Sequence, residues 1–197
     1  INNILNNFII DIIPILNPDG KGILESKHNY CFRQNMNGVD LNRNFDWEWA
    51  GKGSTHKVNS EEYHGKQPFS ENESIFLNNI LLRNQYNIVI DIHSGTQQLF
   101  VPFVDTISRK QKRNQITTFE TQQIKLVKYI QNNSNKFFTN SGIAWKMNDY
   151  GADGTILDYI GGIITKNGIT KYVICAEIYG DPFVDNSIDC FVQFNPN

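Results

Sequence analysis

Residues 88–95 read IVIDIHSG, and this stretch decides the fold. Its apolar run predicts a buried β-strand, and a histidine and a glycine follow where the strand stops. Residues 172–178, YVICAEI, have the same character. So do residues 8–16, FIIDIIPIL, which run into a turn at 17–20. The sequence therefore predicts three buried strands.

Helical patterns lie between these strands. Residues 70–73, SENE, form a capping-box pattern, and apolar residues at helical spacing follow to about residue 84. A further helix is predicted from residue 120 to about residue 132. Residues 21–69 have little periodicity and many Gly, Asn and His, so we expect long surface loops there, where binding groups sit on a rigid scaffold. Apolar strands that alternate with helices indicate an α/β sheet covered on both faces.

The composition of the 197 residues is that of one globular domain. Hydrophobic residues make up 40% and charged residues 19%, which excludes a disordered chain. The 18 basic and 20 acidic side chains nearly cancel, so the chain lacks the positive field of a dedicated nucleic-acid binder. Its longest apolar stretch, 8–16, is interrupted by Asp11 and Pro14 and is too short to span a bilayer. Three cysteines are too few for a disulfide framework, although one bridge is possible.

Two polar side chains stand where predicted strands stop. His93 follows one strand, and Glu177 ends another. In open α/β sheets, ligands collect beyond the carboxyl ends of the strands. Either residue alone would be more typical of a hydrogen-bonded structural group. Together, on two strands of one sheet, they indicate a shared site that fits a metal ligand and a general base.

A second polar cluster lies in the predicted loops, at residues 31–46. It contains Arg33 and Arg43 among several asparagines. The planar guanidinium group suits a carboxylate or a phosphate, so this loop could hold an anion. The alternative is a loop tied by Asn and Asp self-capping, with Arg43 in a surface salt bridge.

Several short motifs, in this order along the chain, resemble the zinc carboxypeptidase family, the group typified by carboxypeptidase A. The resemblance runs from about residue 5 to about residue 180, and residues 62–71 resemble the digestive-type branch. It implies a mixed, largely parallel twisted sheet with helices on both faces. The motifs are Asn17-Pro18-Asp19-Gly20, Phe32-Arg33, residues 38–45, residues 65–73, Asp91-Ile92-His93-Ser94, Tyr150 with Asp158, and Ala176-Glu177.

The resemblance implies a reaction, hydrolysis of the last peptide bond of a peptide or protein with the help of one Zn²⁺ ion. His93 matches the family's third zinc ligand, and neutral imidazole suits zinc. Glu177 matches the general base, which would deprotonate the attacking water and then protonate the departing amine. Arg33 matches the residue that stabilises the oxyanion of the tetrahedral intermediate.

The resemblance also implies how the substrate is held. Asn42 and Arg43 match the pair that binds the terminal carboxylate, and Tyr150 matches the mobile tyrosine that closes over it. Leu157 falls at the floor of the side-chain pocket, where it favours an apolar or aromatic terminal residue. Cys175, two residues before the proposed base, should face the same side and either line that pocket or serve as a small buried hydrophobe.

The chain departs from the family pattern in one essential respect. The first two zinc ligands of the family form a His-x-x-Glu motif ahead of the strand at 8–16, and none of the four histidines here begins such a motif. We therefore expect residues 1–197 to be a partial catalytic domain that lacks the family's N-terminal strands and zinc-ligand segment. Two further zinc ligands are then expected upstream, and with His93 alone this chain is expected to be inactive while its full-length parent is a peptidase. Gly95 is a second departure, since many relatives have an aromatic residue there.

Other classes of function remain open to the sequence. An inactive peptidase-like module that binds peptide C-termini would keep Asn42 and Arg43 but lose a metal ligand or the base. The basic run 109–113, RKQKR, could be a nuclear or nucleic-acid patch, although such short runs are usually solvated loops. The family resemblance implies peptide or protein C-termini as substrates and a secreted, lysosomal or vacuolar location. From the near-neutral charge and the short apolar stretch we expect no nucleic-acid or membrane partner, and we expect a monomer.

Overall fold

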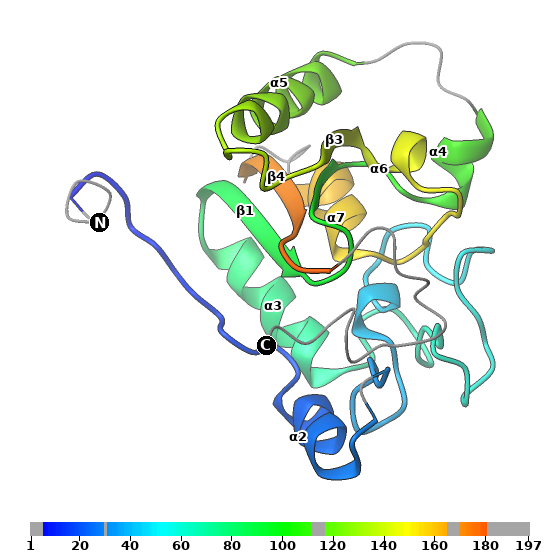
Figure 1. The fold of residues 1–197 in the computed structure, drawn as a ribbon. Coiled ribbons are helices and arrows are strands. Elements are labelled where there is room, and N and C mark those ends of the chain that lie inside the picture. Colours follow the sequence, from blue (N-terminus) through cyan, green and yellow to red (C-terminus); the bar gives the residue numbers. More distant parts are fainter. Residues whose placement is uncertain (1–5, 30, 112–116, 165–169, 181–197) are drawn as a thin grey trace.

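A four-stranded mixed sheet forms the centre of the computed structural model (Figure 1). Strand β1 (Tyr86–His93) pairs in parallel with β4 (Thr170–Glu177), and β2 (Gln98–Val101) pairs in parallel with β3 (Asn140–Ile143). Strands β2 and β4 are antiparallel, which gives the order β1-β4-β2-β3. The sheet is therefore mixed and largely parallel, as predicted. The residues that the structure describes are 6–29, 31–111, 117–164 and 170–180.

Helices cover both faces of this sheet, because the strands present apolar side chains on both. Helix α5 (Thr118–Asn132) packs on one face, and helices α3 (Asn72–Arg83) and α7 (Ile156–Tyr159) pack on the other. Leu99 and the following Phe100 on β2 point to opposite faces and belong to separate apolar cores. The remaining elements are α2 (Pro18–Lys27), the 3₁₀ turn η1 (Leu41–Arg43), α4 (Thr106–Gln111), α6 (Ala144–Met147) and the π-helical turn η2 (Ile160–Ile164).

The stretch at 8–16 does not form the predicted buried strand. It is an extended arm that lies apart from the sheet (Figure 1), and Ile9 in it is 98% exposed. The Tyr86 hydroxyl donates a hydrogen bond of 2.8 Å to the Asp11 carboxylate, which links the arm to the start of β1. Apolar residues indicate that a segment tends to be buried, but a strand also needs a neighbouring strand to receive its backbone hydrogen bonds. Among the described residues, no strand pairs with this arm.

The helix predictions were largely correct, with two local differences. Helix α3 forms as predicted, but the capping box does not, because the Ser70 hydroxyl donates to the side chain of Glu71 instead. The capping box of this fold lies at α5, where the Thr117 and Glu120 side chains each accept from the other's backbone N–H. Helix α2 occupies a region predicted as loop. The sequence does contain a helix-start pattern here. Asn17 caps the helix, and a proline follows it at the first helical position.

Strand β1 is partly buried on one face and exposed on the other, which corrects the prediction of a fully buried strand. It is an edge strand, and helix α5 packs over the other three strands. Ile88, Ile90 and Ile92 alternate along β1 on the side away from the site and are 37%, 50% and 63% exposed. The side chains on the opposite face of β1, Asp91 and His93, are half-buried.

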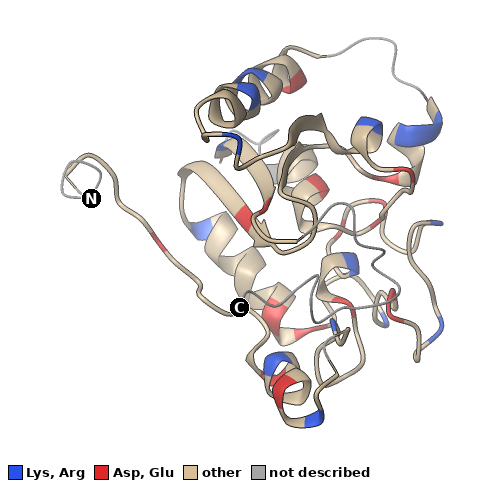
Figure 2. Ribbon diagram, in the orientation of Figure 1, with Lys and Arg blue, Asp and Glu red and all other residues tan. Residues whose placement is uncertain are grey.

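Charged residues of both signs are dispersed over the helices and loops (Figure 2). In the run at 109–113, Arg109 lies on α4 and donates hydrogen bonds to backbone oxygens of Asn148 and Tyr150, while residues 112 and 113 lie outside the described residues. Of the described helices, none is both long enough and apolar enough to cross a bilayer.

Buried polar side chains hold the long loops at 31–69. The Asn44 side chain is fully buried, donates to the carbonyl oxygens of His64 and Gln67, and accepts from the Ser74 hydroxyl at 2.6 Å. Because these groups satisfy the loop backbone, a region without regular secondary structure is fixed against α3.

We predict that Gly154→Ala destabilises the fold. Gly154 has φ +76°, and a Cβ atom there would overlap the carbonyl oxygen of Arg43. Strain in this left-handed region together with the overlap is expected to lower the free energy of unfolding by roughly 2–3 kcal/mol, measured by urea denaturation. Gly22→Ala is the control, because a Cβ atom there meets nothing within 4 Å. In the interior of α2 it should be stabilising by about 0.5–1 kcal/mol. Equal effects of the two substitutions would contradict this account of Gly154.

Candidate active site

The pairing of β1 with β4 brings four polar side chains together. In this parallel register His93 lies opposite Glu177, and Asp91 lies opposite Cys175. Side chains alternate along a strand, so all four project from the same face, the one that also carries the core of α3 and α7. The two residues that the sequence placed at strand ends are therefore neighbours. The backbone N–H of Ile178 also donates to the carbonyl oxygen of His93 at 2.9 Å, which ties the two strand ends together.

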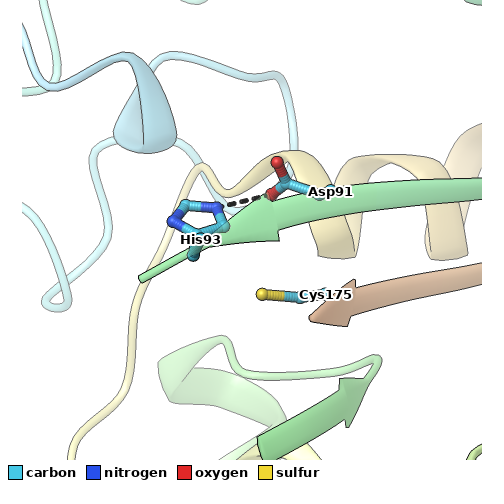
Figure 3. A group of neighbouring side chains, drawn as sticks. All are labelled: Asp91, His93 and Cys175. Carbon is cyan, nitrogen blue, oxygen red and sulfur yellow. Dashed lines mark hydrogen bonds and ion pairs between the residues drawn. The ribbon is translucent and has the colours of Figure 1, made fainter. Parts of the chain in front are cut away.

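His93 is held by Asp91, a residue of the same motif for which the sequence predicted no role of its own. The Nε2–H group of His93 donates to Oδ2 of Asp91 at 2.8 Å (Figure 3). The Asp91 carboxylate is the main cause that raises the pKa of His93 to about 9, with a further contribution from Glu177, while desolvation and the Arg33 cation act in the opposite direction. The contact could have been predicted from the sequence, because residues two apart on a strand have their side chains on one face.

The carboxylate of Glu177 lies against the loop that follows β1. Its Oε2 atom accepts a hydrogen bond of 2.5 Å from the Thr96 hydroxyl. Gly95 packs so close that a Cβ atom there would overlap the carboxylate, and its backbone N–H donates to the Tyr179 carbonyl oxygen. The departure at Gly95 therefore has a local physical reason, because a larger residue in this loop conformation would displace the Glu177 side chain.

The loop before α3 carries two arginines around one buried carboxylate. Nη2 of Arg33 lies 2.8 Å from Oδ2 of Asp40, an ion pair outside hydrogen-bonding geometry, and Nη1 of Arg43 lies 3.9 Å from the same oxygen. Arg43 is 4% exposed, and its Nε group donates to the Gly53 carbonyl oxygen. The surface salt bridge considered for Arg43 is thus wrong, whereas the self-capping of the loop is present, since Asp40 accepts from the backbone N–H of Asn42.

The loop and helix at 150–159 close the other side of this cluster. The Asn42 Oδ1 atom accepts from the backbone N–H of Ile156 at 3.1 Å, which fixes the orientation of the amide. The adjacent Leu157 is buried in the apolar core, against which Cys175 also packs. Tyr150 is exposed as a whole residue, yet desolvation of its phenol raises the pKa. Arg43 lowers this pKa and Glu177 raises it, so both are close enough to act on the phenol.

Two acidic side chains near Leu157 in the sequence accept hydrogen bonds from backbone N–H groups. Asp158 is fully buried and accepts from the N–H groups of Val104 and Asp105, and burial raises its pKa well above the ordinary value. Asp153 is fully buried too and accepts from the N–H groups of Gly53 and Thr106. These bonds hold the loops around Arg43 and α7, so neither carboxylate is free to bind a cationic substrate side chain.

The arrangement combines a base, cations and metal donors on one side of the sheet. Glu177 can take up a proton, and Arg33 and Arg43 can stabilise negative charge. Within the part of the chain that the structure describes, one group of three His, Cys, Asp or Glu residues could share a metal ion, namely Asp91, His93 and Cys175 (Figure 3). Such a cluster has the groups to bind an anion and a cation close to a proton acceptor.

Comparisons with known proteins agree with this fold. The family described as zinc carboxypeptidase matches residues 1–185. Carboxypeptidase A5 of Homo sapiens is 37% identical over 110 residues, which are 51% of this chain and 25% of that protein. Metallocarboxypeptidase A of Trichophyton tonsurans is 32% identical over 115 residues, 52% of this chain and 27% of that protein. The matches to these curated relatives thus span about a quarter of their length.

Solved structures show the same likeness in three dimensions. Bovine thrombin-activatable fibrinolysis inhibitor, in complex with tick carboxypeptidase inhibitor, superimposes with a TM-score of 0.69 at 26% identity, over 84% of this chain and 56% of that chain. Carboxypeptidase A from Helicoverpa armigera has the same fold, with a TM-score of 0.69 at 22% identity over 92% of this chain and 46% of that chain. Together with the family match over nearly the whole sequence, these findings establish that the chain belongs to the zinc carboxypeptidase family.

We predict that Asp91→Asn returns the pKa of His93 from about 9 toward 6.5 in the metal-free protein. Because the folded-state pKa is raised, the pair stabilises the fold fully below pH 6.5, and this stabilisation is lost as the pH rises through about 9. The substitution should therefore flatten the pH dependence of unfolding between these values. Titration of the imidazole ring by NMR measures the pKa directly, and Asp19→Asn on the exposed start of α2 is the control. An unchanged pKa would refute the assigned cause.

Proposed function

We propose that the complete protein containing this chain is a zinc-dependent metallocarboxypeptidase that removes the C-terminal residue of peptides and proteins. The observation that carries the proposal is the pairing of His93 with Glu177 across β1 and β4, on the face that meets the buried Arg43 loop. In this proposal these residues supply a metal ligand, a base and a cation that binds a carboxylate. Membership in the zinc carboxypeptidase family supports the same conclusion.

In this proposal Glu177 is the general base, and Arg33 stabilises the oxyanion. The Glu177 carboxylate takes a proton from the attacking water and passes it to the departing amine. The exposed guanidinium of Arg33, anchored by Asp40, faces the charge that develops on the carbonyl oxygen. When bound, zinc polarises the scissile carbonyl and lowers the pKa of a bound water.

His93 fits a zinc ligand because its donor chemistry and its support are suitable. Nε2–H donates to Asp91, which leaves the other ring nitrogen for a metal, an arrangement common around metal-bound histidines. The complete protein would bind one zinc ion through His93 and two further ligands. These two ligands would come from a His-x-x-Glu motif that these 197 residues do not contain. We accordingly propose that the 197-residue chain alone does not hydrolyse peptides.

The terminal residue of the substrate is held at two points. Arg43 and the Nδ2 group of Asn42 bind its carboxylate, and Tyr150 covers it. Burial of Arg43 strengthens this contact, because a cation away from bulk water interacts more strongly with an anion. Leu157 gives the side chain of the terminal residue an apolar surface, which favours apolar or aromatic terminal residues, and Cys175 packs against the same apolar core.

We also propose that the protein is secreted or lies in a lysosomal or vacuolar compartment and acts as a monomer. Cys31 is disulfide-bonded, whereas Cys175 is a free thiol, and Cys190 lies outside the described residues. A structural disulfide is typical of oxidising compartments, which supports an extracytoplasmic location.

Glu177→Gln is predicted to abolish hydrolysis while largely sparing ligand binding. In the protein completed with its zinc-ligand segment, kcat should fall by at least roughly 100-fold, because the amide cannot accept the proton of water. Affinity for a carboxylate-bearing product, measured by calorimetry, should change little. Glu62→Gln on an exposed loop is the matched control.

The result of this experiment also tests the alternative function. Full activity in Glu177→Gln would remove this residue as the base. A completed wild-type protein that binds peptide C-termini without cleaving them would instead favour an inactive binding module, which retains Asn42 and Arg43.

A panel of peptides tests how the terminal residue is held. Peptides that end in Phe with a free carboxylate should be cleaved at least roughly 10- to 100-fold more efficiently than the same peptides with a terminal amide, because the amide offers Arg43 no charge. Peptides that end in Phe should also exceed those that end in Lys in kcat/KM. Equal or better cleavage of the Lys peptides would contradict the role of Leu157.

A further inference from the structure

Three metal-binding side chains of different chemistry converge at the ends of β1 and β4. One donor atom each of Asp91, His93 and Cys175 lies within 4.8 Å of the others, and all three side chains are partly buried. Figure 3 shows the Cys175 sulfur and the two side chains of β1 on the same side of the paired strands. The set arises from the register alone, since Asp91 and Cys175 are direct partners and His93 is two residues further on.

The three side chains are available for a ligand. Cys175 is a free thiol, and the hydrogen bond between Asp91 and His93 joins two members of the set. Asp153 and Asp158, in contrast, are bound to backbone N–H groups and could not leave them without a cost in stability. The neighbouring Glu177 adds negative charge beside the set, which favours a cation there.

The distances are compatible with one ion after small side-chain movements. Ligands of a tetrahedral zinc ion stand about 2.0–2.3 Å from the metal, which puts them roughly 3.5 Å from one another. The Nε2 and Oδ2 atoms are closer than this, at 2.8 Å, and would separate when an ion enters between them. The widest separation in the set, at most 4.8 Å, needs to close by about 1 Å.

We propose that this chain binds one thiophilic divalent cation of the zinc class through Asp91, His93 and Cys175, without any residue outside its 197 residues. Thiolate, imidazole and carboxylate together suit Zn²⁺ or Co²⁺ and not Mg²⁺ or Ca²⁺, which prefer oxygen ligands. On binding, the cation takes the place of the thiol proton, which passes to solvent, and the neutral imidazole carries its one proton on Nδ1 so that Nε2 can bind the metal. A water molecule completes the fourth position.

This mode of metal binding differs from the one used in the proposed peptidase reaction, although both use His93. There, His93 keeps its hydrogen bond to Asp91 and offers its other nitrogen to a zinc ion that is also held by residues outside this chain. Here, Nε2 itself binds the metal, and Cys175 and Asp91 are direct ligands. A neutral imidazole offers one unprotonated nitrogen, so the two modes of binding exclude each other.

Titration of the metal-free 197-residue chain with Co²⁺ tests the proposal. We expect one Co²⁺ per chain with an absorption band of thiolate-to-metal charge transfer. Cys175→Ser should lose this band and bind at least about tenfold more weakly, and Cys175→Val, which keeps an apolar side chain in the core, should do the same. Asp91→Asn should keep the band but weaken binding. Asp19→Asn, an exposed change of the same kind on α2, should leave both unchanged.

A second readout is thermal unfolding in the presence of Zn²⁺. An ion that binds the folded chain raises its Tm, so at the same Zn²⁺ concentration the Tm of the wild-type chain should rise more than that of either Cys175 variant. Failure to bind Co²⁺, binding without a thiolate band, or equal binding by the Cys175 variants would each overturn the proposal. None of these measurements uses a peptide or depends on Glu177 as a base, so they stand or fall separately from the peptidase proposal.

Discussion

The parallel register between β1 and β4 is the constraint on which the rest of the site depends. It sets His93 beside Glu177 and Asp91 beside Cys175, with all four side chains on one face. A shift of a single residue would turn the side chains of one strand to the opposite face of the sheet and separate the base from the histidine. The packing of β4 opposes such a shift, because Val173 and Ile174 are packed into separate cores on the two faces.

Around this rigid edge, irregular loops are fixed by buried hydrogen bonds and not by secondary structure. Asn44, Asp153 and Asp158 are each fully buried and satisfy N–H or C=O groups of loops that are distant in sequence. This explains how an irregular segment can hold Arg43 in a buried position. It also explains why acidic side chains that lie close to Leu157 in sequence do not alter the apolar character of that region.

His93 is the residue at which the possible chemistries meet. Its hydrogen bond to Asp91 can orient the imidazole toward a catalytic zinc ion, or it can give way to an ion shared with Asp91 and Cys175. The difference lies in which nitrogen carries the proton and in the ligands that surround it. The same strand pairing therefore supports a peptidase site when further ligands are present and a smaller metal site within this chain.

The sequence by itself determined the alternation of strands and helices, the ends of β1 and β4, and helices α3 and α5, because apolar periodicity is a local property of the chain. The motifs also indicated the family and the residues of the candidate site. Tertiary structure alone decided that residues 8–16 form an exposed arm, that Arg43 is buried, and that Asp91 supports His93. Pairing, burial and hydrogen-bond partners depend on segments far apart in the sequence, and a local pattern carries no information about which of them will meet.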